Sequence, residues 1–315
     1  MGLGIHLARL AKGALGDQRP LPAIHAPHGL PLTCYHPQRA SQLREGERLR
    51  FNPPHDETNL VIPCGKCIGC RVATAAQWGN RCQHEASLYK HNRFVTLTYD
   101  EHHLPPNGFL RKRDVQLWMK RLRKEKHPSR IRFFLAGEYG EHTGRAHYHA
   151  LLFNCWWDDE KKCGQQGEHT LYSSEQANAT WENGEVRIGK LTGASAAYVA
   201  QYTVKGSKQP KASQNGAQPT KPFLLMSRMP GIGMEWLEQY ADDLKHGYLI
   251  IDGRKQPIPS YYKRKVKEQN PERHYTLKWK AQDETLDRPA IDQPRLTAGE
   301  IIHLARRKLT AKTRL

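Results

Sequence analysis

Two histidines separated by one residue, His147 and His149, are the clearest chemical signal in this 315-residue sequence. They lie in the segment Arg145-Ala-His-Tyr-His-Ala-Leu-Leu-Phe153, whose aliphatic and aromatic residues predict a β-strand over 146–153. Side chains two positions apart in a strand point to the same face, so both imidazoles project together and could share one cation. The alternative is a pair of ordinary surface or core histidines, because the chain contains 17 of them.

Glu138 is the candidate for a third ligand. It ends a strand predicted over 131–137, and a tight hairpin between the two strands would return the chain so that Glu138 lies beside His147. Two imidazoles and one carboxylate leave coordination positions open for water and substrate oxygens, as Mg²⁺ or Mn²⁺ requires for chemistry at phosphate. Glu141 is a competing carboxylate, but a position inside the turn would hold it less rigidly.

Two phenols and an ammonium group share one face of a helix predicted over 196–205. Tyr198, Tyr202 and Lys205 occupy positions i, i+4 and i+7 of this helix, which Thr192 or Ser195 would cap. A tyrosine oxygen can attack phosphorus when a metal polarises the phosphate and a nearby cation eases loss of the phenolic proton. The alternative is an amphipathic helix that buries its tyrosines in a core.

Basic residues point to a nucleic-acid ligand. Lys and Arg number 49 against 31 acids, a net charge of +18, which favours a polyanionic partner over a merely solvated basic surface. A helix predicted over 114–126, with Asp114 as its N-cap and an apolar stripe from Val115 to Leu122, exposes a basic ridge. The candidate DNA contacts are Lys120, Arg121, Arg123 and Lys124 on this ridge, Thr96 and Thr98 in a strand over 93–99, and Arg228 in a Gly/Pro-rich loop. Ordinary sheet threonines and a simple turn are the alternatives for the last three.

A cysteine cluster forms a separate candidate site. Cys64, Cys67 and Cys70 are spaced by two residues each, and Cys34 could supply a fourth thiolate for a closed structural Zn²⁺ site. An iron–sulfur centre and free thiols on a Gly-rich turn are the alternatives. The sequence has no run of 18 apolar residues and no secretory layout at its start, so we expect neither a membrane span nor a signal peptide, and a reducing compartment suits the thiols.

The strands and helices that must position these groups indicate an α+β fold. It has a central antiparallel sheet with helices packed on it, preceded by a Cys-rich region. We expect a flexible arm over 1–30, the Cys-rich region and a helix over 31–90, and a core over 91–206 that includes an insertion at 155–185. A linker, a helix and a hairpin over 207–260 and a basic tail over 261–315 complete the chain.

Three segments of this chain resemble, in order, the three motifs of HUH endonucleases, the enzymes that start rolling-circle replication. The sequence is most similar to the replication initiators of small single-stranded DNA phages, the gokushovirus branch of the microviruses, over about 34–265. One departure is Ala146, where that family has proline before the first histidine. The residues that carry the resemblance are Phe94-Val-Thr-Leu-Thr98, Gly137-Glu-Tyr-Gly140 with Arg145-Ala-His-Tyr-His149, Tyr198-x-x-x-Tyr202-x-x-Lys205, Cys64-Gly-Lys-Cys67-Ile-Gly-Cys70-Arg71 and Ser227-Arg-Met-Pro-Gly-Ile-Gly233.

The resemblance implies an RRM-like palm in which His147, His149 and Glu138 bind a divalent ion. Tyr198 and Tyr202 would alternate as nucleophiles that nick and rejoin single-stranded origin DNA through a phosphotyrosine, assisted by Lys205. It also implies partnership with the host replication machinery, in the cytoplasm of a bacterial host. Two other functions fit the residues alone: a non-enzymatic binder of single-stranded nucleic acid, and a metal-dependent phosphodiesterase that uses water as its nucleophile.

Overall fold

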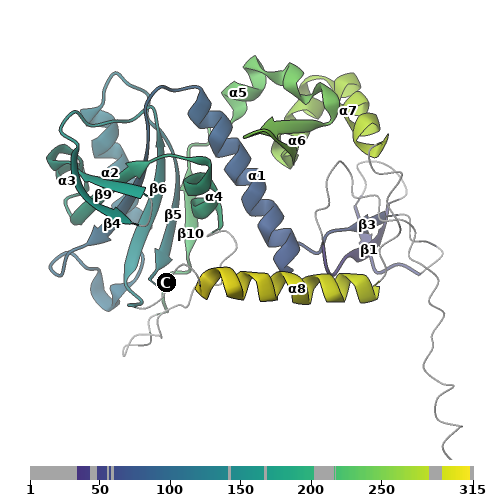
Figure 1. Cartoon of the computed structure of the whole chain (residues 1–315), viewed down its shortest axis with the longest axis horizontal. Helices are drawn as coiled ribbons and strands as arrows, with labels where there is room; N and C mark the ends of the chain where they lie inside the picture. The colour runs from purple at the N-terminus through teal and green to yellow at the C-terminus, as the bar shows by residue number, and fades with distance from the viewer. Residues whose placement is uncertain are drawn as a thin grey trace, which may run out of the picture.

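The computed structural model describes residues 34–42, 48–54, 57, 60–140, 143–166, 169–201, 216, 218–283 and 293–312. Within these residues the chain forms an α+β fold around an antiparallel sheet of seven strands in the order β10-β5-β6-β4-β9-β8-β7 (Figure 1), which confirms the predicted fold class. In chain order the strands are β4 Asn92–Tyr99, β5 Arg132–Tyr139, β6 Ala146–Phe153, β7 Lys161–Gln166, β8 His169–Ser173, β9 Gly184–Lys190 and β10 Phe223–Met226.

Both faces of the central strands are covered by helices, which explains why β5 and β6 are buried almost throughout. Helices α2 (Lys112–Glu125) and α3 (Glu175–Trp181) pack on one face, where Val95, Leu135 and Tyr148 meet the buried stripe of α2. Helices α1 (Ile68–Ser87) and α4 (Gly193–Gln201) lie on the other face with Phe134 and Leu151 (Figure 1). Because side chains alternate along a strand, even-numbered residues of β4 and β5 share the α1/α4 face with odd-numbered residues of β6.

The described residues of 155–185 (155–166 and 169–185) contribute to the sheet and its core, so the predicted insertion is wrong. They contain β7, β8 and α3, and Trp181 of α3 is fully buried and donates its indole N–H to the carbonyl oxygen of Thr98 at 2.8 Å. The segment is polar because β7 is an exposed edge strand, whereas its packing depends on a few residues such as Ala177 and Trp181.

Side-chain caps mark the starts of α1 and α4 but not that of α2. Helix α1 begins at Ile68, where the Cys67 side chain accepts the backbone N–H of Cys70. Helix α2 begins at Lys112, so Asp114 lies in its first turn and is not its N-cap; it accepts the hydroxyl of Tyr99 at 2.7 Å instead. Helix α4 follows Thr192, whose hydroxyl accepts the N–H of Ser195 at 3.2 Å, as predicted for Thr192.

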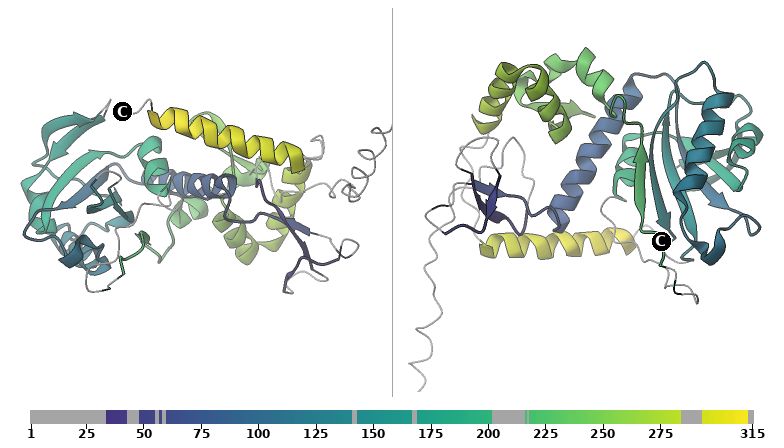
Figure 2. Two further views of the ribbon diagram at one scale, coloured as in Figure 1. Left: turned by 90° about the horizontal axis from the view of Figure 1, so that it is seen from below. Right: turned by 180° about the vertical axis from the view of Figure 1, so that it is seen from behind.

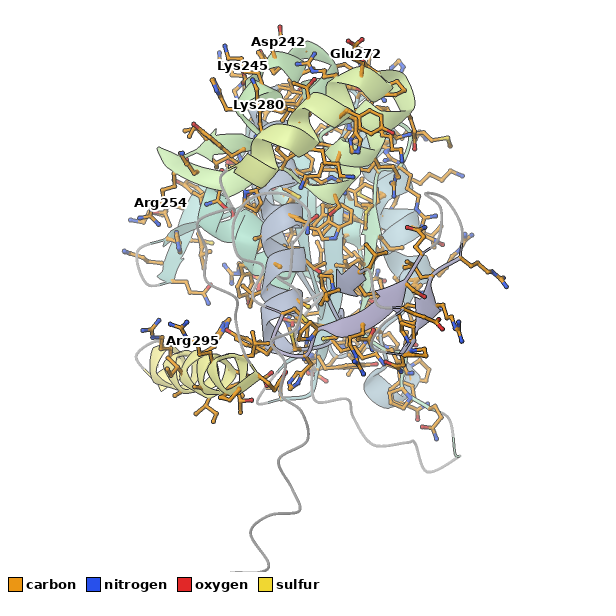
Figure 3. The ribbon with its side chains drawn as sticks, turned by 90° about the vertical axis from the view of Figure 1, so that its right-hand side faces the viewer. Asp242, Lys245, Arg254, Glu272, Lys280 and Arg295 are labelled. Atoms are coloured by element: carbon orange, nitrogen blue, oxygen red, sulfur yellow. The ribbon has the colours of Figure 1, made fainter. Side chains whose placement is uncertain are left out.

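The C-terminal part of the described chain is more structured than a basic tail. Its core combines Met234, Leu249, Tyr262 and Leu277, and the predicted hairpin is present as β11 and β12. The elements are α5 Met234–Gln239, η3 Ala241–His246, β11 Tyr248–Ile251, β12 Arg254–Pro257, α6 Ser260–Gln269, α7 Pro271–Asp283 and α8 Gln293–Lys312. The labelled side chains Asp242, Lys245, Glu272 and Lys280 lie on the surface of this unit, and Arg295 lies on α8 (Figure 3).

A small three-stranded sheet precedes α1. It consists of β1 (Gln38–Ser41), β2 (Arg50–Phe51) and β3 (Leu60–Ile62), and α8 extends from beside it past the start of α1 (Figure 2). A short turn of 3₁₀-helix, η2 (Pro106–Gly108), links β4 to α2. Among the helices in the described ranges, none is both long and apolar enough to cross a membrane.

Candidate functional site

The β5–β6 hairpin brings the three predicted metal ligands together. In its register Glu138 pairs with His147, and Ala136 pairs with His149, so all three ligand side chains lie on the α1/α4 face. Oε1 of Glu138 is 2.9 Å from Nε2 of His147 and 3.2 Å from Nε2 of His149. The candidate ligand atoms of the three residues lie within 4.8 Å of one another, a spacing that one cation can bridge.

The outer nitrogen of each imidazole also has a partner. Nδ1 of His149 lies 3.0 Å from the hydroxyl of Thr96, and Nδ1 of His147 lies 3.1 Å from the carbonyl oxygen of Arg145. Such contacts fix the ring orientation of a metal-binding histidine and leave Nε2 directed at the site. Thr96 was predicted to contact DNA, but its hydroxyl supports His149, with which Thr96 pairs across the adjacent strands β4 and β6.

The carboxylate is buried yet charged. Glu138 and His149 are each 7% exposed, and His147 is half-buried. Burial raises the pKa of Glu138, but the hydrogen bonds and charges of His147 and His149 outweigh this effect and bring it to about 2. The site therefore presents an anionic oxygen at neutral pH, which suits a hard divalent cation.

Tyr198 lies next to this cluster. Helix α4 packs on the same sheet face, and the Tyr198 ring meets His149 edge-to-face with 5.4 Å between ring centroids. Phe94 stacks nearly parallel to His149 at 5.7 Å and meets Tyr198 at 6.2 Å, so it supports both rings; the sequence showed Phe94 only as part of a motif. Tyr198 is 36% exposed and thus accessible from solvent. Tyr202 and Lys205, as well as Glu141, lie outside the described residues.

The predicted basic ridge lies on the opposite face of the sheet from Glu138. Arg121 donates to the carbonyl oxygens of Thr180 at 2.7 Å and Trp181 at 3.0 Å, so it joins α2 to α3. Arg123 donates to the carbonyl oxygen of Ile131 at 3.4 Å. Lys120 and Lys124 are exposed on this face. The structure therefore does not bring these four residues near the candidate metal ligands.

The two remaining candidate DNA contacts differ in their surroundings. The hydroxyl of Thr98 donates to the carbonyl oxygen of Glu185 at 3.3 Å, within the sheet. Arg228 is exposed in the loop after β10, on the α1 side of the sheet, where it lines a cavity.

The cysteine cluster is a second candidate metal centre. All seven cysteines lie within the described part of the chain and none forms a disulfide, and the sulfurs of Cys34, Cys64, Cys67 and Cys70 lie within 4.8 Å of one another. Backbone N–H groups surround them: Cys64 N–H is 3.2 Å from the sulfur of Cys34, and Cys67 N–H is 3.3 Å from that of Cys64. Burial raises the pKa of Cys64, but the N–H groups of Cys67 and Lys66 lower it to about 7, so this thiolate forms readily.

Known phage proteins are similar to this chain over most of its length. Residues 92–207 match the family described as "Replication-associated protein ORF2/G2P". Replication-associated protein VP4 of Bdellovibrio phage phiMH2K is 33% identical over 68% of this chain and 70% of its own. Replication-associated protein ORF2 of Spiroplasma virus 4 is 32% identical over 75% of this chain and 80% of its own.

A more distant relative is replication-associated protein ORF4 of Chlamydia phage 1, 25% identical over 65% of this chain and 53% of its own. No solved structure matches the chain significantly. The alignments with the first two relatives cover most of this chain and most of each relative, and an identity above 30% over that length is sufficient to assign the family. They confirm the resemblance to microvirus proteins that the motifs predicted. The chain therefore belongs to the family of phage replication-associated proteins.

Proposed function

We propose that this protein starts rolling-circle replication by nicking and rejoining single-stranded origin DNA through a phosphotyrosine. The observation that carries the proposal is the convergence of Glu138, His147 and His149 from two paired strands, with the ring of Tyr198 5.4 Å from His149. Membership of a phage replication family supports a role in DNA replication. The host polymerase would then extend the new 3′ end, in the cytoplasm of the bacterial host.

The described residues fit a divalent ion, and His147, His149 and Glu138 would hold Mg²⁺ or Mn²⁺. The ion would polarise the scissile phosphate and stabilise its charge. The Tyr198 oxygen would form a bond to phosphorus while the bond from phosphorus to the 3′ oxygen breaks, and the phenolic proton is lost as the 3′ hydroxyl gains one. The energy of the phosphodiester is kept in the phosphotyrosine, so the transfer needs no ATP. Tyr202 would carry out the second transfer, with Lys205 beside the phenol or phosphate.

Detection of a covalent adduct tests the proposal. Wild-type protein mixed with labelled single-stranded origin DNA and Mn²⁺ should yield a protein–DNA adduct that EDTA suppresses. Replacing both Tyr198 and Tyr202 by Phe should abolish it, whereas Tyr275→Phe, an exposed tyrosine on α7, should not. An adduct that persists in the double variant would show that the nucleophile lies elsewhere.

A non-enzymatic single-strand binder is the second candidate, favoured by the net charge of +18. It predicts binding that falls steeply with salt and does not respond to EDTA. His147→Ala separates the two functions: the enzyme should lose its covalent product and keep most of its affinity for DNA.

We also propose that Cys34, Cys64, Cys67 and Cys70 hold a structural Zn²⁺. Four thiolates in a compact cluster, with backbone N–H groups directed at their sulfurs, suit a closed tetrahedral site. Elemental analysis of purified protein should find about one zinc per chain. Cys67→Ser should lose it, and Cys163→Ser, at an exposed cysteine outside the cluster, should keep it. Iron in place of zinc would indicate an iron–sulfur centre, and the absence of metal would exclude both.

A further inference from the structure

A cavity of about 670 Å³ lies between α1, the loop 227–233 and α6, apart from both candidate metal centres. Its floor and walls are largely apolar, whereas its side chains include four cations and, among the described residues that line it, no acid. The lining residues are Trp78, Arg81, Met226, Ser227, Arg228, Met229, Pro230, Gly231, Ile232, Met234, Tyr261, Arg264 and Lys265.

Arg81 forms part of the wall and is fixed in place. Its guanidinium lies between the rings of Trp78, at 4.1 Å, and Tyr261, at 3.9 Å, and its Nε donates to the carbonyl oxygen of Ile232 at 2.9 Å. This stack joins α1 to α6 and to the loop, so the cavity has a preformed back wall.

The rim carries the cations that a ligand can reach. Arg228 and Arg264 are exposed and Lys265 is half-buried. One exposed carboxylate forms ion pairs with two of them: Glu268 lies 2.6 Å from Lys265 and 3.8 Å from Arg264. The nearby Glu235 already pairs with Arg130 at 2.8 Å, so the rim keeps a positive excess. A positive rim around an apolar hollow matches a nucleotide, which has an anionic phosphate and a base with apolar faces.

The cavity shares a sheet face with the nicking site. Strand β10 pairs with β5 so that Met226 lies opposite Phe134, and the loop after Met226 leaves β10 at the end of β5 remote from Glu138. Arg132, at that end of β5, donates to the carbonyl oxygen of Pro230 at 2.9 Å. The distance along β5 between Arg132 and Glu138 is about 20 Å, at ~3.3 Å per residue. One extended single strand is therefore long enough to reach both places if it passes over the α1/α4 layer that covers this face.

We infer that this cavity is a second DNA subsite, which holds a nucleotide of the same single strand at a distance from the scissile phosphate. The identity of the strand rests on the proposed function, whereas binding of a nucleotide in the cavity does not. Phosphate would contact Arg228 and Arg264, and the base would enter the hollow between Met226 and Pro230.

Charge removal tests the phosphate contacts. Anisotropy with oligothymidylates of increasing length should show wild-type affinity rising once the strand spans both places. Arg228→Ala with Arg264→Ala should weaken binding of the long oligonucleotide about tenfold and reduce the salt slope by about 1.4, as two phosphate contacts predict. Lys161→Ala with Lys162→Ala, at exposed positions on the edge strand β7, removes the same charge elsewhere. Equal losses in the two double variants would overturn the subsite.

Photocrosslinking separates the subsite from the nicking chemistry. Oligonucleotides that contain 5-iodouracil at single positions should crosslink to the peptides containing Met229 or Tyr261 from one position only, in wild type and in Tyr198→Phe alike. If the wild type forms no covalent adduct but this crosslink persists, the proposed function fails and the subsite stands. If adducts form and these peptides are never labelled, the subsite is wrong and the nicking function stands.

Discussion

The hydroxyl of Thr96 lies 3.0 Å from Nδ1 of His149, while Nε2 of the same ring lies 3.2 Å from Glu138. His149 is thus held from both sides by groups on two different strands. Its ring orientation depends on the pairing of β4 with β6 as much as on the hairpin that contains Glu138.

Thr96→Val should weaken the metal site without unfolding the sheet, because valine keeps the shape and the β propensity of threonine. Loss of the contact to His149 should raise the Mn²⁺ concentration needed for half-maximal adduct formation by about 10- to 100-fold. Thr96→Ser should restore it. The matched control is Thr98→Val, whose hydroxyl contacts the carbonyl oxygen of Glu185, and an equal effect there would contradict the role of Thr96.

Removal of the negative charge of Glu138 should weaken binding of the divalent ion. Glu138→Gln keeps the size of the side chain but replaces an anionic ligand by a neutral amide, so calorimetric titration should show Mn²⁺ binding at least about tenfold weaker. Glu101→Gln, at an exposed carboxylate on the loop after β4, should bind Mn²⁺ as the wild type does. Unchanged binding in Glu138→Gln would remove Glu138 from the ligand set.

Removal of the metal proposed at the cysteine cluster should loosen helix α8. Tyr35, next to Cys34, donates its backbone N–H to the sulfur of Cys67 at 3.3 Å, and its hydroxyl is 2.9 Å from Nδ1 of His303 on α8. The metal would therefore order the residues on which α8 docks. Hydrogen exchange over 293–306 should accelerate when the metal is removed, while exchange in β5 and β6 should not. Equal protection of α8 with and without metal would contradict this coupling.

Acid should destabilise the protein through His84. Burial between Trp236 and Tyr262 lowers the pKa of His84 to about 4, from an ordinary value near 6.5. Below pH ~6.5 the imidazole of His84 binds a proton in the unfolded chain but stays neutral in the folded protein. The free energy of unfolding should therefore fall by roughly 3 kcal/mol between pH 6.5 and pH 4.

The control for His84 is the difference in free energy of unfolding between the wild type and a variant that lacks the imidazole. Because other groups titrate in the same range, urea unfolding of His84→Phe should be compared with wild type at each pH. The free energies of unfolding of the two proteins should converge as the pH falls through this interval, or the variant should become the more stable of the two. A constant difference would show that His84 is not responsible.

The sequence predicted the parts of the site that depend on local spacing. His147 and His149 are two residues apart on a strand, and a tight turn fixes Glu138 opposite His147, so the ligand cluster could be predicted. Tyr198 required only that its helix pack on the same sheet face. The placement of Thr96 required the pairing of strands distant in sequence, and its hydroxyl was therefore interpreted as a DNA contact.

Other parts of the fold depended on long-range packing that periodicity does not reveal. Strand β10 has only four residues and pairs with β5 across a separation of about 90 residues, and it was missed. The polar edge strand β7 was interpreted as part of an insertion for a similar reason. An amphipathic pattern shows that α2 buries one side, but not which face of the sheet it covers, so its cations were grouped with the site.

The position of α2 has a further consequence for experiments on this protein. The central sheet stands between Tyr198 and the ammonium groups of Lys120 and Lys124. A phosphodiester bound at Tyr198 and a polyanion lying along those lysines would be on opposite faces of the sheet. Neutralising the lysines would thus report on contacts made on the α2 face alone, because it leaves Tyr198 and the three candidate metal ligands unchanged.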